Sequence, residues 1–366
     1  MSRYRDVDLV FRNLKTRVQP AAGEFPKHIG DGPASTLYRL TLLTVDSPEH
    51  NRLRRVISTA FNPRSVAGME DWMVEIIDRR LRELQNQDVV DVVPTLANNI
   101  PVDIGCRLLH IPPGDGVVLV ERMRDLVMIF LQGEFTPDAL SRADQSASFF
   151  FEYFRKHLEK LPRLPDGDLV GAVIKAGKNG VLSEEDMVAM MTDIFMASYH
   201  TSWVSLANAV ELFGRFAEQR KRLLADPSLS TKAWNEVLRY APAVHFRHRY
   251  LSEPATLHGV RIEPGVRVLL GLASANWDEA VFEDPDRFDI SRPLEPAHIA
   301  FGGGSHYCLG AYLARLEGSL FLPRFLKSYP DYRVLDTAPL PTDNMDIPFF
   351  PSLPIELRHS PVTKSA

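Results

Sequence analysis

Hydrophobic positions recur at helical spacing along most of the chain. Residues 66–84 and 96–109 are amphipathic, and residues 114–160 hold two long patterns with a break near 133–137. Residues 187–216 are apolar and contain no proline. Ser183 lies before them as a candidate helix cap, followed by acidic residues. A helix of about 30 residues spans a whole domain, so we expect a buried central helix here.

Patterns typical of strands are fewer and shorter. Residues 88–93 alternate with β-branched side chains, and residues 243–265 follow Pro242 with strand-like runs and hairpin turns. Residues 20–45, rich in proline and glycine, predict a long irregular loop. We therefore expect a mainly α protein with a small β region, as a single domain over 1–366. The helix-rich part covers about 46–240 and 308–330, and the β region covers about 243–300 and 331–358.

Composition narrows the class of protein. Hydrophobic residues at 45% and charged residues at 24% are ordinary for a soluble protein. The formal net charge of −5 gives no basic surface for nucleic acid or an anionic membrane. The N-terminus has no apolar run for a signal peptide or membrane anchor. Cys106 and Cys308 are the two cysteines. If Cys308 binds a metal no disulfide can form, which fits the cytoplasm.

Residues 301–310 form a glycine-rich loop that carries Cys308 to the start of a predicted helix. Amide groups and the helix dipole at that point favour a thiolate and lower the thiol pKa. A buried structural cysteine is the plain alternative. A phosphate-binding loop would need a lysine after its last glycine, and a zinc site would need partner ligands nearby. A metal bound by one thiolate needs other ligands, and a porphyrin supplies four.

The loop matches Phe-Gly-x-Gly-x-His-x-Cys-x-Gly at every fixed position. It thereby resembles the haem-ligand loop of the cytochrome P-450 superfamily. The resemblance implies that Cys308 is the axial ligand of haem b, that Phe301 packs beside the haem and that His306 meets a propionate. The glycines that match the pattern are Gly302, Gly304 and Gly310.

Three further basic residues are candidates for the haem propionates. His50 and Arg54 share one helix face, in a stretch that resembles the propionate-binding helix of the superfamily. A solvated basic face is the alternative. Counting back from Gly259 places Arg249 at a third propionate-binding position, with Arg247 as the other choice.

The predicted central helix resembles the superfamily helix that lies over the haem. Thr201 keeps the threonine of that pattern, whereas Ser198 replaces a glycine and His200 replaces an acid. The resemblance gives these three residues roles in dioxygen activation and proton delivery. His200 has two interpretations, a core or groove histidine and a replacement proton relay. A third alternative is a reaction that needs no relay.

Glu236 and Arg239 lie on a predicted helix over 230–240, followed by Pro242. Their spacing is that of an ordinary helical ion pair, but the position resembles the buried structural pair of the superfamily. By the same resemblance the substrate pocket is bordered by four residues: Val244, Phe246, Ala197 and Phe349. Core packing is an equally good account of Phe349.

The resemblance implies a haem-dependent monooxygenase that hydroxylates a small or medium apolar organic substrate, with secondary metabolism as a candidate setting. Its partners would be dioxygen and a ferredoxin or flavodoxin-type electron donor with an NAD(P)H reductase. Two alternatives stay open: oxidative coupling or cyclisation on the same haem-thiolate chemistry, and a haem-binding sensor or inactive relative. The first helix and first strand pair usual in the superfamily have no counterpart in the sequence, so we expect the fold without them.

Overall fold

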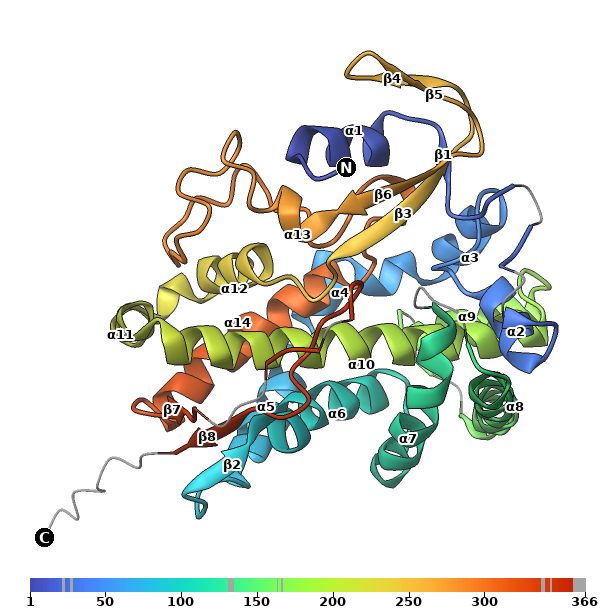
Figure 1. Cartoon of the computed structure of the whole chain (residues 1–366). Coiled ribbons are helices and arrows are strands. Elements are labelled where there is room, and N and C mark those ends of the chain that lie inside the picture. Colours follow the sequence, from blue (N-terminus) through green and yellow to red (C-terminus); the bar gives the residue numbers. More distant parts are fainter. Residues whose placement is uncertain are drawn as a thin grey trace, which may run out of the picture.

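Helices dominate the structure, a computed structural model that describes residues 1–21, 24–26, 29–130, 135–162, 164–165, 167–336, 340–342 and 344–357 (Figure 1). This confirms the mainly α prediction. In chain order the helices are α1 (Tyr4–Arg12), α2 (Pro33–Leu40), α3 (Glu49–Ile57), α4 (Pro63–Ala67), α5 (Glu70–Arg82), α6 (Asn99–Leu108), α7 (Gly116–Val127), α8 (Pro137–Lys160), α9 (Leu169–Lys178), α10 (Glu184–Arg215), α11 (Ala217–Ala225), α12 (Ser230–Tyr240), α13 (Leu272–Ala275) and α14 (Ala311–Ser328).

The predicted central helix is α10, which crosses the middle of the molecule (Figure 1). Ser183 begins it with a capping box: its hydroxyl accepts the amide of Asp186, and the Asp186 carboxylate accepts the amide of Ser183. Most of its side chains are buried, since α6, α8, α12 and α14 pack around it. Such an all-round apolar helix gives a rigid axis along which other elements are placed.

The strands form small antiparallel sheets. They are β1 (Thr16–Arg17), β2 (Val89–Asp91), β3 (Phe246–Leu251), β4 (Ala255–Leu257), β5 (Val260–Ile262), β6 (Arg267–Gly271), β7 (Arg333–Val334) and β8 (Pro354–Glu356). The orders are β1-β3-β6, β2-β8-β7 and β4-β5. Arg17 pairs with Tyr250, and Val90 pairs with Ile355. Two strands from the N-terminal half thus complete sheets whose other strands come from the C-terminal half.

Several local predictions need correction. The predicted loop over 20–45 contains α2, which starts at Pro33 as the first helical residue. The predicted helix over 66–84 is two helices, α4 and α5, because the chain turns at Gly68. No side chain caps α3, and the nearby Asp46 carboxylate accepts hydrogen bonds from the amides of Val18 and Gln19 instead.

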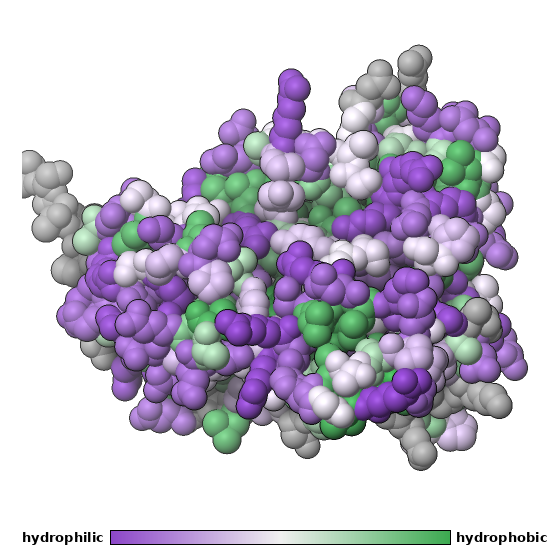
Figure 2. Space-filling view, turned by 90° about the horizontal axis from the view of Figure 1, so that it is seen from above, coloured by the Kyte–Doolittle hydropathy of each residue, from purple (hydrophilic) through white to green (hydrophobic). Residues whose placement is uncertain are grey.

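The surface carries mixed polar character. Figure 2 shows a face that is mostly hydrophilic, with hydrophobic residues in small separate groups. Among the described helices, none is both long and apolar enough to cross a bilayer.

Candidate active site

Cys308 lies at the end of a tight loop, residues 301–310, just ahead of α14. Its amide donates to the carbonyl oxygen of Phe301 at 3.0 Å, which closes the loop. Gly304 has a φ of +67°, and a Cβ there would lie 2.1 Å from the carbonyl oxygen of Phe11. Only glycine therefore lets the loop pack directly against the end of α1.

The aromatic ring of Phe301 packs beside this loop. Its centroid lies 4.7 Å from the guanidinium carbon of Arg315 and 6.3 Å from the ring of Tyr307. Gly302 also has a left-handed φ, +66°. A Cβ at Gly310 would meet nothing within 4 Å, so there is open space beside this residue, two positions after Cys308.

The thiol of Cys308 is free, and burial raises its pKa. A hydrogen bond from the Gly310 amide and the charges of Arg54, Arg315 and Arg247 act in the opposite direction. The expectation that the helix start alone lowers the thiol pKa is therefore wrong, because desolvation exceeds these contributions. A thiolate here needs a further positive charge beside the sulfur, which a coordinated metal ion provides.

Buried and partly buried basic side chains surround the loop. The rings of His50 and His306 lie 4.0 Å apart, and both ring nitrogens of His50 are enclosed without a hydrogen-bond partner among the described residues. Arg54 donates to the carbonyl oxygen of Tyr307 at 2.8 Å. In the described part of the chain, no carboxylate lies within 4 Å of the guanidinium of Arg54 or of that of Arg249. The Arg249 residue is only 8% exposed. Buried donors and cations of this kind call for an anionic partner.

Arg247 and Arg249 project from the same side of β3, since they are two residues apart on a strand. Burial is the largest cause of the lowered pKa of His306, followed by the charges of His50 and Arg249. The charge of Arg247 instead acts to lower the pKa of Cys308 and that of His200 on α10. Arg249 therefore lies on the histidine side of the loop. Arg247 lies within electrostatic range of both the sulfur and the central helix.

One turn of α10 is open although the helix around it is buried. Ala197 is exposed, and the side chains next to it are partly exposed: Ser198, His200, Thr201 and Ser202. Protein atoms therefore do not cover this turn, in contrast to the turns before and after it. The open turn holds the residues that the sequence predicted to handle dioxygen and protons.

The hydroxyl groups of this turn bond to their own helix. Ser198 donates to the carbonyl oxygen of Phe195 at 3.0 Å, and Thr201 donates to that of Ala197 at 3.2 Å. A Cβ on Gly105 of α6 would lie 3.1 Å from the Ser198 hydroxyl. The serine that replaces the expected glycine is thus accommodated by a glycine on the facing helix.

His200 is uncharged near neutral pH. Burial lowers its pKa to about 4, and the charge of Arg247 acts in the same direction. No described residue forms a hydrogen bond with its ring, whose centroid lies 5.8 Å from that of the Trp203 ring. A neutral imidazole still has one hydrogen-bond donor and one acceptor, but it is a poor proton source.

The predicted pocket residues lie at different depths. Val244 is buried and Phe246 partly buried, and Phe349 packs its ring 5.2 Å from that of Trp203. A role for Trp203 in the site was not predicted from the sequence. The signal for it is its spacing, because residues three apart on a helix, such as His200 and Trp203, are neighbours. Its indole nitrogen is enclosed without a partner among the described residues. The structure thus joins Phe349 to the open turn through an aromatic contact.

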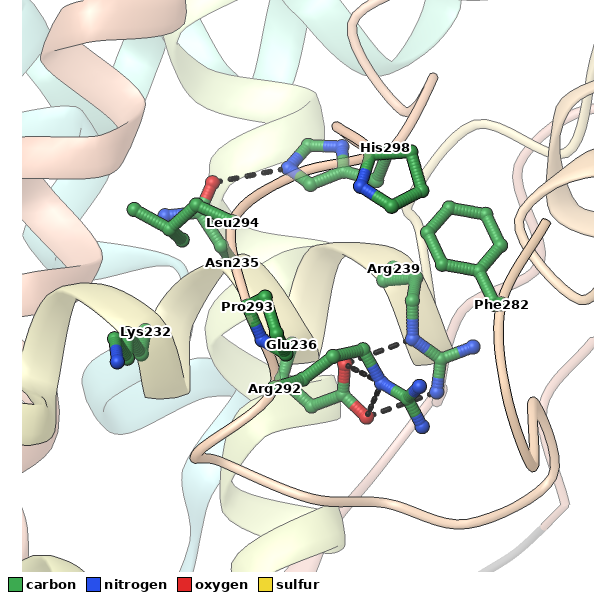
Figure 3. Close-up of a pocket in the computed structure, with 10 residues that line it drawn as sticks. Lys232, Asn235, Glu236, Arg239, Phe282, Arg292, Pro293, Leu294 and His298 are labelled. Carbon is green, nitrogen blue, oxygen red and sulfur yellow. Dashed lines mark hydrogen bonds and ion pairs between the residues drawn. The ribbon is translucent and has the colours of Figure 1, made fainter.

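Glu236 and Arg239 form a buried ion pair, with side chains 1% and 2% exposed (Figure 3). The Arg239 Nε and Nη2 donate to the two oxygens of Glu236 at 2.7 and 2.8 Å. Arg292 approaches the same carboxylate at 3.2 Å. Arg239 also donates to the carbonyl oxygens of Asn276 and Pro285. The pair therefore ties α12 to the segment that leads to the cysteine loop.

Two buried carboxyl groups were not predicted from the sequence. Burial raises the pKa of Glu317, on α14, to about 8, and that of Asp193, on α10, to about 7. Ser202 hydrogen-bonds to Glu317. Both acids occupy positions that the local periodicity assigns to buried apolar residues. This mismatch is the signal by which the sequence could have indicated buried acids.

Comparisons with known proteins identify the family. A cytochrome P450 from Bacillus subtilis (strain 168) is 32% identical over 341 residues, which cover 91% of this chain and 81% of that protein. Cytochrome P450 CYP107DY1 from Priestia megaterium is 31% identical over 316 residues, 86% of this chain and 76% of that protein. The chain belongs to the cytochrome P450 family. The family model, Cytochrome P450, matches residues 224–351.

Solved cytochrome P450 structures share the whole fold. P450BioI in complex with hexadec-9Z-enoic acid ligated acyl carrier protein superposes with a TM-score of 0.88 at 26% identity, over 97% of this chain and 91% of that one. The myxobacterial CYP267B1 in complex with myristic acid gives 0.88 at 26% identity, over 98% and 90%. This cytochrome P450 therefore binds haem b. It is an oxidoreductase that uses dioxygen and a redox partner to oxidise an organic substrate, a monooxygenase.

The residues present fit the cofactor. Haem b carries two carboxylates, and the enclosed nitrogens of His50, the partly buried guanidinium of Arg54 and the buried guanidinium of Arg249 have no carboxylate partner within the described residues. The open turn at Ala197 and the free thiol of Cys308 supply space and a single sulfur ligand.

Proposed function

We propose that the protein, as one catalytic domain over 1–366, hydroxylates a small or medium organic substrate with a mainly apolar body. The observation that carries this proposal is the combination of the free thiol of Cys308, its surrounding unpaired cations and the open turn of α10. When bound, haem supplies the oxidising power drawn from dioxygen and two electrons. The chain supplies orientation, proton supply and exclusion of water.

Each candidate residue has a task in this proposal. Cys308 holds the iron, with Phe301 packed beside the loop to limit access of water. His50, Arg54, His306 and Arg249 bind the two propionates by charge-assisted hydrogen bonds. Arg247 adds positive charge between the sulfur and α10.

The open turn positions small polar groups over the reaction site. The hydroxyl of Thr201, now bonded to the carbonyl oxygen of Ala197, is free to exchange that bond for one to dioxygen or water. His200, being neutral, passes a proton only by donating from one ring nitrogen while accepting at the other. Glu317 accepts a hydrogen bond from Ser202 and has a structural role. The apolar residues Val244, Phe246 and Phe349 border the substrate.

We propose a ferredoxin or flavodoxin-type electron donor and a cytoplasmic location, since the net charge is moderate and the two cysteines are unpaired. The exposed side chain of Arg55 is one cation available to an acidic donor. Arg52 is not, because it is paired with Glu49 and Asp186.

A second function, oxidative coupling or cyclisation, is favoured by one observation. The acid of the usual proton relay is replaced by His200, whose pKa of about 4 makes it a poor proton source. In coupling, the hydrogen atoms abstracted from the substrate end in water, so the steps after cleavage of dioxygen draw no proton from His200. Reactions under isotopically labelled dioxygen separate the two: a hydroxylated product gains one labelled oxygen atom, whereas a coupled product gains none. Substrate-independent electron consumption without product would contradict both.

A further inference from the structure

We infer that Asp193 selects substrates that carry a cationic nitrogen, and holds that nitrogen at the end of the pocket away from Cys308. This inference rests on the proposed function, because it names the class of substrate for the same site. Asp193 is on α10, four residues before Ala197 and eight before Thr201. Residues four apart share a helix face and lie about 6 Å apart along the axis. Asp193 is therefore one turn from the open turn and on the same face.

The carboxylate of Asp193 has one fixed partner. The amide of Leu42 donates to its Oδ2 at 3.0 Å. The loop that carries Leu42 is itself held in place, since the hydroxyls of Thr41 and Thr44 lie 2.9 Å apart and Asp46 accepts two backbone amides. The orientation of the Asp193 carboxylate is therefore set before any ligand binds, which reduces the entropic cost of recognition.

The second oxygen, Oδ1, is left to accept from a ligand. No described residue donates to it, and it is not among the fully enclosed polar atoms, while the residue keeps 9% of its surface exposed. In the described chain no cation lies within ion-pair distance of Asp193, and no charged side chain offsets the burial that acts on it. Without a counter-charge, burial favours the neutral form of this carboxyl, and a cation beside it restores the charged form. A ligand cation supplies the missing charge.

Charges elsewhere in the site set the direction of binding. Arg247 lies within range of Cys308 and His200, so positive charge occupies the reaction end. A cationic group is repelled there and attracted to Asp193. Between the two ends, the side chains next to Asp193 along α10 are apolar and buried, as in Ile194 and Met196. The site therefore fits an apolar body with a positive nitrogen at the end remote from the oxidised carbon.

The test uses three probes with the same ten-carbon chain: the cation decyltrimethylammonium, the neutral decanol and the anion decanoate. A quaternary nitrogen has no lone pair and does not ligate iron, so its binding reports charge recognition alone. Affinities are measured by calorimetry on the haem-loaded protein, Asp193→Asn and Glu185→Gln. Asparagine keeps an acceptor for the Leu42 amide and removes the charge. Glu185 is an exposed acid at the start of the same helix, so its variant matches the change in charge.

We expect the wild type to bind decyltrimethylammonium about tenfold or more tightly than decanol, and decanoate least tightly. Asp193→Asn should lose the preference, and Glu185→Gln should keep it. Equal binding of decanoate by the wild type, or an unchanged preference in Asp193→Asn, would overturn the inference. The wild-type comparison stands even where a variant fails to fold. A reduced carbon-monoxide spectrum of the same samples reports on the proposed function separately, since it does not depend on which probe binds.

Discussion

Replacing Glu236 by glutamine is expected to cost much more stability than the same change at Glu49. Both acids pair with an arginine three residues later on a helix. The Glu236 and Arg239 side chains are 1% and 2% exposed, whereas those of Glu49 and Arg52 are 56% and 35% exposed. Removing one partner of a buried pair leaves the other charge uncompensated and costs about 3–5 kcal/mol. An exposed pair contributes about 0–1 kcal/mol.

The loss at Glu236 extends beyond one arginine. The same carboxylate accepts the amide of Asp289 at 3.0 Å and lies 3.2 Å from Arg292. A glutamine amide would direct two hydrogens at guanidinium groups that are already donors. Because domains are stable by only about 5–15 kcal/mol, a loss of this size should also loosen the segment before the cysteine loop and reduce haem retention.

Thermal melting followed by circular dichroism, together with the ratio of haem to protein, provides the assay. Glu236→Gln should lower the melting temperature by at least about 5 °C relative to Glu49→Gln and reduce the haem ratio. Bound cofactor violates two-state unfolding, so the comparison is made between the two variants under identical loading conditions. Equal melting temperatures and full haem content in both variants would refute the assignment of a structural role to the buried pair.

Three further predictions follow from single contacts. Gly304→Ala should destabilise the protein and reduce haem binding, because its Cβ would lie 2.1 Å from the Phe11 carbonyl oxygen; normal melting would count against this packing. His200→Ala should lower product formed per electron consumed at unchanged haem content if the ring relays protons, and unchanged coupling would remove it from the mechanism. Glu317→Gln should become more stable relative to wild type as pH rises from about 4.5 to about 8, since a folded pKa raised to about 8 makes the wild type lose stability across that window; parallel melting curves over this range would contradict it.

Local sequence patterns accounted for the elements that depend on nearby residues. The candidate cap Ser183 and the apolar run after it predicted α10, and the fixed positions of residues 301–310 predicted the cysteine loop. At the predicted break near 133–137, α8 begins at Pro137 with Thr136 as its cap. These features follow from periodicity, caps and turn residues, which act over a few positions.

Features that depend on distant parts of the chain were not predictable in this way. The pairing of β1 with β3 and of β2 with β8 joins segments more than two hundred residues apart. The raised thiol pKa of Cys308 results from burial by the whole fold, whereas the sequence indicated only the helix start beside it. The buried carboxyl of Asp193 acquires its significance from Leu42 on a loop far away in sequence. Register and desolvation are set by tertiary structure.

The central claim is that Cys308 is the thiolate ligand of the haem iron. The reduced carbon-monoxide difference spectrum of the purified protein tests it most directly, with Cys106→Ser as the matched control because Cys106 is the other cysteine and is buried in the core. Wild type and Cys106→Ser should both show a Soret band at the thiolate-ligated position, and Cys308→Ser should not. A band at the neutral-ligand position in the wild type, or a thiolate band that persists in Cys308→Ser, would contradict the account.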